Sequence, residues 1–206
     1  MNETKIKGLV NELQCQTYFT ALGYNVSIPL GEDCRYDYII DVDGFLVKVQ
    51  AKTSRLHNNN GIVFSVKSSY KTSNGTVNKT YSEEEIDFFS TFYDNECYLV
   101  PVSQVGKAEK KLLFDSSNKV RNYSYLSDYQ AEKILEYIKE GKDMPNDNIP
   151  KIEQYDLENN FIQSFSSPIL AAKSIGKNQS SHIIDCAKGR RKTAYGYVWK
   201  YVKEEK

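Results

Sequence analysis

The sequence predicts an α/β domain with a central mixed sheet, followed by a small C-terminal unit of two short helices and short strands. Three observations predict this division. One helical pattern precedes three short strand-like runs, a polar segment at 142–150 breaks the periodicity, and two short helices joined by a tight turn follow. We therefore expect a first domain over residues 1–141, a linker over 142–150 and a second unit over 151–206.

Residues 3–22 have the pattern of a helix. Apolar and small side chains at positions 6, 9, 10, 13 and 17 fall on one face at 3.6-residue spacing, and Gly23 ends the pattern. Glu12 lies on the rim of this stripe, roughly 120° from its centre. We expect the helix to pack beside the sheet with Glu12 at its edge.

Three strands are predicted next, over residues 24–29, 36–42 and 45–52. The Asp43-Gly44 pair between the last two is a strong signal for a hairpin. Residues 62–68 are a further strand, and the polar stretch 70–81 is favoured as a hairpin over a loop that lies along DNA. The pattern Ser82-Glu-Glu-Glu85 predicts a capped helix through residue 92.

The rest of the chain alternates strands and helices. We expect a buried strand over 97–102 and a helix that opens at Ser127 and is closed by Gly141. In the second unit, 152–157 and 161–165 form a small hairpin, Ser167 caps a helix over 168–175, and a second helix runs from Ser180 or Ser181 to residue 187. A strand over 195–202 closes this outline of a helix-turn-helix.

The net charge of the whole chain is zero, but the balance of basic and acidic residues differs between residues 1–150 and 151–206. From Lys151 onward there are ten Lys/Arg against six Asp/Glu, which makes nucleic acid a plausible partner for the second unit. No apolar run approaches the ~20 residues of a membrane span. The four scattered cysteines favour reduced thiols over a zinc site or disulfides. We expect an intracellular, cytoplasmic and nucleoid-associated protein that binds no membrane.

One hairpin carries residues suited to phosphodiester chemistry. Gln50 and Lys52 share a face of their strand, and Asp37 starts the neighbouring strand across the short turn. A carboxylate, an amide and an ammonium can therefore meet at one end of the hairpin. Lys52 would position or deprotonate an attacking water, or stabilise charge on a phosphate.

The same residues could hold Mg²⁺, or Mn²⁺ in its place, because hard cations take oxygen ligands. Asp37, the Gln50 amide and the Ala51 backbone carbonyl would supply three oxygens, and Glu12 a second carboxylate. Each residue also has an ordinary interpretation, since a lone aspartate at a strand start is usually a turn residue. The hairpin alone therefore does not distinguish a metal site from ordinary turn and surface residues.

The motifs of residues 3–70 resemble those of the PD-(D/E)XK nuclease superfamily. The matching positions are Gly8-x(3)-Glu12, Gly23-Tyr24-x-Val26, Pro29-x-Gly31, Tyr36-Asp37 and Val49-Gln50-x-Lys52-Thr53. The resemblance is greatest to the intron-encoded homing endonucleases of this group, and it implies a restriction-endonuclease-like fold. It also implies that Asp37 binds metal, Lys52 is catalytic and Glu12 is the acid of the first helix. Gln50 stands where most members carry Glu or Asp, and the intron-encoded branch is similar in using Gln.

The C-terminal segment resembles a nuclease-associated modular DNA-binding domain, NUMOD type 1. Ser167-Pro-Ile-x-Ala-Ala-Lys-Ser-Ile-Gly176, Ser181-x-Ile183 and Gly196-Tyr-Val-Trp-Lys-Tyr201 carry the resemblance. It implies a helix-turn-helix whose second helix enters the major groove. Base contacts are then expected from Gln179, Ser180, Ser181, His182 and Asp185, and phosphate contacts from Lys188, Arg190, Arg191 and Lys192. Trp199 and Tyr201 are expected in the core.

The sequence therefore predicts a site-specific, metal-dependent endonuclease of homing type that acts on double-stranded DNA. Cutting both strands with one site per chain calls for a homodimer or homotetramer. Two alternatives stay open at this point. One is a Holliday-junction or branched-DNA resolvase, and the other is a DNA-binding protein whose nuclease site has decayed, to which Gln50 points.

Overall fold

The computed structural model describes residues 2–31, 33–73, 75–115, 123–142, 151–165 and 167–202. Its elements in chain order are α1 (Glu3–Ala21), β1 (Asn25–Ser27), β2 (Tyr38–Val42), β3 (Phe45–Ala51), β4 (Arg55–His57), β5 (Gly61–Ser65), β6 (Lys67–Thr72), β7 (Gly75–Thr80), β8 (Phe88–Tyr93), β9 (Glu96–Pro101), β10 (Glu109–Leu113), α2 (Ala131–Glu140), β11 (Ile152–Tyr155), β12 (Phe161–Phe165), α3 (Pro168–Ser174), α4 (Ser181–Ala187) and β13 (Val198–Tyr201). The predicted linker, apart from Lys142, lies outside the described residues.

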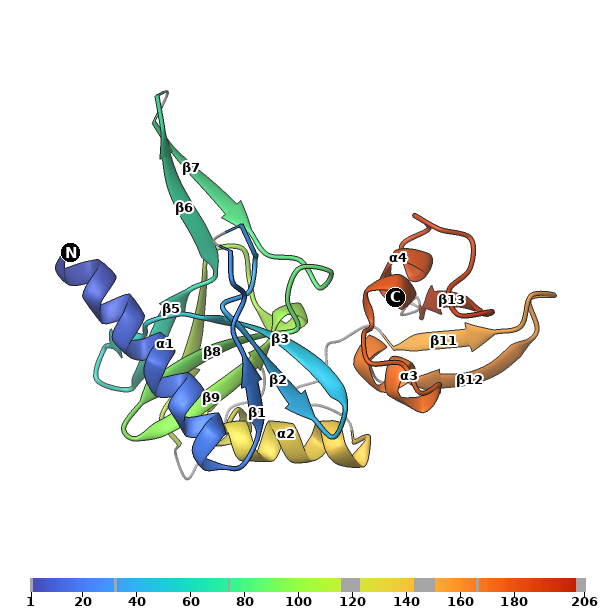
Figure 1. The fold of residues 1–206 in the computed structure, drawn as a ribbon, viewed down its shortest axis with the longest axis horizontal. Coiled ribbons are helices and arrows are strands. Elements are labelled where there is room, and N and C mark those ends of the chain that lie inside the picture. The colour runs from blue at the N-terminus through green and yellow to red at the C-terminus, as the bar shows by residue number, and fades with distance from the viewer. Residues whose placement is uncertain are drawn as a thin grey trace.

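The central sheet has the strand order β1-β2-β3-β8-β9. β3 and β8 are parallel and the other neighbours are antiparallel, so the predicted mixed sheet is confirmed. Helices α1 and α2 pack on one face of this sheet (Figure 1). The other face is covered by a smaller sheet of order β10-β5-β4.

Two hydrophobic clusters lie on the two faces of the central sheet. Phe88 and Phe89, adjacent in β8, are both fully buried, but they belong to different clusters because side chains alternate along a strand. Phe88 shares its cluster with Phe19 of α1, and Phe89 shares the other with Phe64 of β5. β8 is therefore an interior strand with both faces buried.

Helix α1 packs with a different face from its apolar stripe. The stripe residues Ile6, Leu9, Val10 and Leu13 are each 44–49% exposed. The residues that pack inward are Cys15 and Phe19, together with Asn11, whose Oδ1 accepts a hydrogen bond from the Phe92 backbone N–H at 3.0 Å. An apolar face of the helix is left on the surface.

The β2–β3 hairpin forms as predicted. Asp43 and Gly44 both have positive φ, at 53° and 84°, which is the backbone that a two-residue type I′ turn requires. The Gly44 N–H also donates to Asp41 Oδ1 at 2.6 Å. This turn fixes the register in which Tyr38 lies opposite Val49.

The helix predicted over residues 82–92 is wrong. The capping contact exists, since the Ser82 N–H donates to Glu85 Oε2 at 3.1 Å, but the chain leaves this turn and continues as strand β8. The sequence FFSTFY favours a strand, and β8 pairs with β3 along one edge and with β9 along the other, while the two hydrophobic clusters bury its faces. Tertiary pairing therefore outweighs the local signal.

The helix predicted from Ser127 starts later. Ser127 lies in a short 3₁₀ turn, Leu126–Asp128, and α2 begins at Ala131. Its end is as expected, because Gly141 closes it in the left-handed conformation with φ 70°.

Every predicted element of the C-terminal unit forms, although two strands are shorter than predicted: β11 ends at Tyr155, and β13 begins at Val198 because residues 195 and 196 are in a turn with positive φ. β11 and β12 form the hairpin, and β13 pairs with the free edge of β11 to give a three-stranded sheet. The Ser167 side chain caps α3 by accepting from the Leu170 N–H at 3.3 Å. Trp199 is 1% exposed and its Nε1 donates to the Ala194 carbonyl at 2.9 Å, so it is a core residue.

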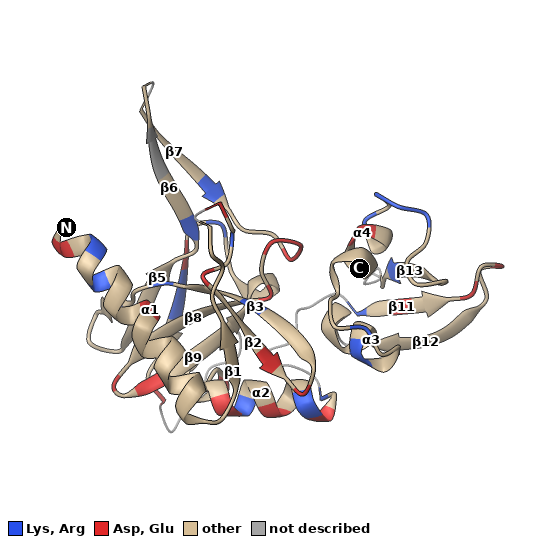
Figure 2. Cartoon of the chain, viewed as in Figure 1, with Lys and Arg blue, Asp and Glu red and all other residues tan. Residues whose placement is uncertain are grey.

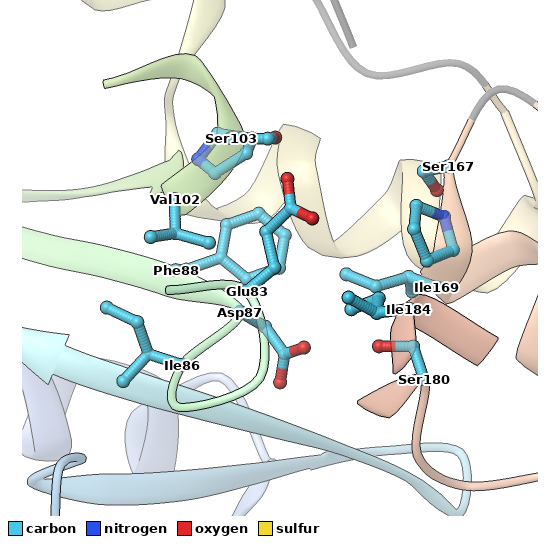
Figure 3. A pocket seen from close by; sticks show the side chains of 12 residues that line it. Glu83, Ile86, Asp87, Phe88, Val102, Ser103, Ser167, Ile169, Ser180 and Ile184 are labelled. Carbon is cyan, nitrogen blue, oxygen red and sulfur yellow. The ribbon is translucent and has the colours of Figure 1, made fainter. Parts of the chain in front are cut away.

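The two units meet along a seam that contains several polar contacts. The Leu46 N–H donates to the Asn178 carbonyl at 3.3 Å, and the Lys173 ammonium donates to the Ile138 carbonyl at 2.6 Å. A cavity of about 30 Å³ lies between the two units (Figure 3). Asp87 and Phe88 line it on the side of the first domain, and residues of α3 and α4 line it on the side of the C-terminal unit. This volume suits one or two waters rather than a ligand.

No helix in the described part of the chain is long and apolar enough to cross a membrane.

Asp87 gives this fold a specific pH dependence. Burial raises the pKa of its carboxyl to about 6, against the opposing effects of the Lys48 charge and the Lys48 N–H, which donates to Asp87 Oδ2 at 2.8 Å. Because the folded-state pKa lies above the ordinary 3.8, the native protein holds this proton more tightly than the unfolded chain does. The stabilisation of the folded protein by protonated Asp87 is complete below about pH 4 and is lost as the pH rises through about 6.

We expect Asp87→Asn to remove this loss, since an amide does not ionise. The free energy of unfolding of the variant, minus that of the wild type, should grow by about 1–3 kcal/mol from pH 4 to pH 7. Urea unfolding followed by circular dichroism measures this difference. A difference that stays constant over the range would contradict the role of Asp87.

Candidate functional site

The three residues that the hairpin pattern singled out meet at one end of β3. Asp37 immediately precedes β2, and its backbone N–H donates to the Val49 carbonyl at 2.9 Å, which extends the ladder by one step. Its Oδ2 accepts from the Ala51 N–H at 2.7 Å and from Gln50 Nε2 in a very short contact. The Asp37 carboxylate is thus held against the strand that carries Gln50 and Lys52.

Glu12 approaches the same point from α1. Its Oε1 accepts a hydrogen bond from Gln16 Nε2 at 3.0 Å. Burial raises the pKa of the Glu12 carboxyl, and the negative charge of Asp37 raises it further. Two carboxylates therefore lie close enough to repel each other.

Burial also raises the pKa of Asp37, although three neighbours oppose this. The Ala51 N–H and the Gln50 amide donate to the carboxylate, and the Lys52 charge attracts it, so each lowers the pKa. The two donors and the Lys52 charge therefore offset part of the effect of burial on this carboxyl.

The arrangement has the oxygens for a divalent cation. Gln50 Nε2 lies 3.3 Å from the Ala51 carbonyl oxygen as well as against Asp37, so these three groups surround one point. An amide presents either its N–H₂ or its oxygen, and turning Gln50 end for end would direct a third oxygen inward. With Glu12 nearby, the donor set fits a hard cation, which would also relieve the repulsion between the carboxylates.

Among the described residues no group of three or more His, Cys, Asp or Glu side chains is gathered as a metal cluster. The candidate site therefore depends on an amide and a backbone carbonyl for part of its ligands.

Lys52 lies beside these groups and is mostly buried. Its ammonium donates to the Tyr81 hydroxyl at 3.1 Å and to the Lys67 carbonyl at 3.2 Å. Burial lowers the pKa of Lys52 to about 8; the Asp37 charge opposes this decrease and the Arg35 charge adds to it. The side chain is fixed by two oxygens at the edge of the site.

Arg35 and Tyr81 complete the wall of the site, and neither was predicted. The Arg35 guanidinium lies over the Tyr81 ring, 4.0 Å from its centroid, and its Nε is 3.1 Å from Glu85 Oε1. No residue pattern links these positions. The one available signal was that Arg35 stands two residues before Asp37.

The predicted DNA-contact residues of the C-terminal unit lie just before, on and just after α4. Gln179, His182, Lys188, Arg190, Arg191 and Lys192 are exposed and Ser181 is partly exposed. Ser180 is 4% exposed and lines the seam (Figure 3), so in this arrangement it does not face solvent. Arg191 Nη1 contacts His182 Nδ1, which places a predicted phosphate contact beside a predicted base contact.

Two of these basic residues face acids of the first domain. Lys188 Nζ lies 3.4 Å from Glu84 Oε1 and 4.0 Å from Glu83 Oε2, and Arg190 forms a very short ion pair with Glu84. The Tyr201 hydroxyl donates to Glu83 Oε2 at 3.0 Å. The acidic turn before β8 thus holds the basic end of α4.

Comparisons with known proteins match the two parts of the chain to two families. The sequence profile of a PD-(D/E)XK endonuclease family matches residues 2–132, a range that holds Glu12, Asp37, Gln50 and Lys52. The profile of the NUMOD1 domain matches residues 151–187.

A curated relative and a solved structure illustrate this similarity. A probable mobile endonuclease B of Enterobacteria phage T4 is 44% identical over 50 residues, which are 24% of this chain and 19% of that protein, so the chain spans about a fifth of that relative. The solved structure of a bacterial homing endonuclease, I-Ssp6803I, superposes with a TM-score of 0.54 at 24% identity, over 66% of this chain and 95% of that one. It shares the fold of the first domain.

The repulsion between the two carboxylates leads to a direct prediction. In the Asp37→Asn variant the pKa of Glu12 should fall, because a negative charge that opposes its ionisation is removed. An NMR titration of the Glu12 side-chain carboxyl carbon measures this pKa in both proteins. An unchanged Glu12 titration would show that the two carboxylates do not share one site.

Proposed function

Because the chain belongs to the PD-(D/E)XK endonuclease family, we propose that it is a site-specific endonuclease of homing type that hydrolyses double-stranded DNA with Mg²⁺ or Mn²⁺. The C-terminal NUMOD1 domain and the descriptions of the two similar proteins, a homing endonuclease and a probable mobile endonuclease, support this assignment.

The observation that carries the proposal is the meeting of Asp37, Gln50 and Lys52 at the end of β3. Asp37 Oδ2 contacts Gln50 directly and accepts from the Ala51 N–H at 2.7 Å, and its charge acts on the Lys52 ammonium. Glu12 adds a second carboxylate from α1. We propose that these four side chains are the catalytic set.

Each of them has a distinct role in hydrolysis. Asp37, Glu12, the Gln50 amide and the Ala51 carbonyl would hold the cation, which when bound stabilises negative charge on the scissile phosphate. Lys52 positions or deprotonates the water that attacks phosphorus in line, and its positive form stabilises charge on the phosphate oxygens. The bond from phosphorus to the 3′ oxygen breaks as the bond to water forms; the attacking water gives a proton to Lys52 or to solvent, and the leaving 3′ oxygen takes a proton from solvent water.

The C-terminal unit supplies DNA affinity in this proposal. The N-terminal end of α4 enters the major groove, with Gln179, Ser181 and His182 facing base edges. Lys188, Arg190, Arg191 and Lys192 hold phosphates. We assign residues 1–141 to the nuclease domain, 142–150 to the linker and 151–206 to the DNA-binding unit.

A cut through both strands requires two catalytic sites, so we infer a homodimer or a homotetramer. The exposed stripe Ile6, Leu9, Val10 and Leu13 on α1 supports an association of chains, because four large aliphatic side chains in contiguous positions are costly to leave in water.

One observation favours a second candidate, a DNA-binding protein that does not cut. Gln50 donates its N–H₂ group to Asp37 and to the Ala51 carbonyl, so it satisfies oxygens that a cation would otherwise take. A cleavage assay separates the two functions.

We expect Asp37→Ala and Lys52→Ala each to reduce cleavage by about 100-fold or more, since each removes a group that stabilises the transition state. The assay is linearisation of a plasmid pool with randomised inserts in the presence of Mg²⁺. Glu136→Gln, an exposed change on α2, is the control and should cut as the wild type does. Cleavage that survives in either alanine variant would rule out the mechanism, and wild-type binding without cleavage would favour the second candidate.

A further prediction follows from the pairing of Lys188 and Arg190 with Glu84. In the Glu84→Gln variant these two cations lose an internal partner and become available to phosphates, so affinity for a duplex of arbitrary sequence should rise about 2- to 10-fold at low salt. Gel-shift titrations at several salt concentrations measure this. Glu136→Gln removes the same charge elsewhere, and equal affinities of the two variants would contradict the prediction.

A further inference from the structure

The β6–β7 hairpin is a two-stranded sheet that projects from the first domain (Figure 1). Its strands pair in register from Lys67 opposite Thr80 to Thr72 opposite Gly75, and within the described residues neither strand pairs with another. Every residue of β7 is exposed. An isolated hairpin is marginally stable in water, so one that extends this far is suited to bind something along its length.

The chemistry of this segment suits a polyanion. From Gly61 to Ser82 the sequence contains three lysines, at positions 67, 71 and 79, and no Asp or Glu. Figure 2 shows lysine at the base of the hairpin and no acidic residue along its described part. Short polar side chains lie between the lysines, and Ser69 Oγ and Asn78 Oδ1 are 2.6 Å apart across the strands.

The base of the hairpin is fixed to the candidate catalytic site. The Lys67 carbonyl accepts from the Lys52 ammonium at 3.2 Å. Arg35 holds both strands, since its guanidinium donates to Ser68 Oγ at 2.8 Å and to the Thr80 carbonyl at 2.9 Å. Lys79 pairs with Glu85 at 2.9 Å. These contacts set the direction in which the hairpin leaves the site.

The hairpin also has the dimensions of a groove-reading element. Six residues in each strand at about 3.3 Å per residue span roughly 17–20 Å. The major groove is about 12 Å wide and admits a two-stranded ribbon. A ribbon of this length would contact about four to six base pairs at a rise of about 3.4 Å each.

We propose that the β6–β7 hairpin is a second DNA-reading element, which enters the major groove beside the bond that is cut and reads the base pairs there through polar side chains such as Ser69 and Asn78. The inference rests on the proposed function, because it places duplex DNA over Asp37 and Lys52. It adds a reader that is attached to the nuclease domain and separate from the helix-turn-helix. Bases near the cut and bases far from it are then recognised by different parts of the chain.

The test uses the full-length protein and a pool of duplexes with randomised sequence. Duplexes that the protein retains in EDTA are sequenced, and the duplexes that it cuts in Mg²⁺ are sequenced separately to locate the cut. In a shortened variant, residues 69–78 are replaced by Asn-Gly, which leaves Ser68 opposite Lys79 and supplies a two-residue turn. In a milder variant, Ser69→Ala and Asn78→Ala are combined.

A matched control is available on an exposed edge strand. The double change Asn25→Ala and Ser27→Ala removes the same two side-chain types from β1, where both residues are exposed. We expect this protein to select the same sequences as the wild type. Circular dichroism melting of all variants establishes that they are folded.

With both hairpin variants we expect base preference to fall by about 10-fold or more per position within the four to six base pairs next to the cut, and to persist at positions farther away. An unchanged preference profile would overturn the proposal. A loss spread evenly over the whole target would also overturn it, since this would indicate a general electrostatic effect. If the wild type and the control retain selected duplexes but cut none, the proposed function fails while the binding selection still tests the hairpin.

Discussion

The parallel pairing of β3 with β8 is the constraint on which the rest of the molecule depends. It places Val49, Gln50 and Ala51 beside Phe88, Phe89 and Ser90, and the Lys52 N–H then donates to the Ser90 carbonyl at 2.8 Å. The ladder therefore runs up to the candidate catalytic lysine. Because the acidic turn directly precedes β8, the same pairing also decides where Glu83 and Glu84 meet the C-terminal unit. The candidate catalytic site and the contact between the two units share one structural origin.

The part of the fold that could be predicted from sequence is the part whose signals are local. The Asp43-Gly44 turn, the Ser167 cap and the Gly141 helix end each act within a few residues, and each forms as predicted. The segment from Ser82 onward carries a local helix signal, but this signal produces only a single turn before the chain continues as β8. Residues Phe88 to Tyr93 form a strand that pairs with β9 directly after it and with β3, which lies more than thirty residues earlier in the sequence and to which no short pattern refers.

The candidate site likewise contains residues that a local sequence pattern predicts and residues that it does not. Asp37, Gln50 and Lys52 are separated by a single tight turn, so hairpin geometry is enough to bring them together. Arg35 and Tyr81 contact each other only after the β6–β7 hairpin returns to the body of the domain, and neither belongs to a motif. The Tyr81 hydroxyl nevertheless accepts a hydrogen bond from the Lys52 ammonium, and the Arg35 charge lowers the pKa of Lys52. The family motifs point to the candidate catalytic groups, and the fold brings other side chains into contact with them.

The single tryptophan gives the two units different optical properties. Trp199 is buried in the C-terminal unit, and the chain has no other indole. Intrinsic fluorescence excited at the indole band therefore reports on the DNA-binding unit alone, whereas the circular dichroism signal comes from the whole chain. The two signals together can distinguish independent melting of the units from a single cooperative transition without any added label.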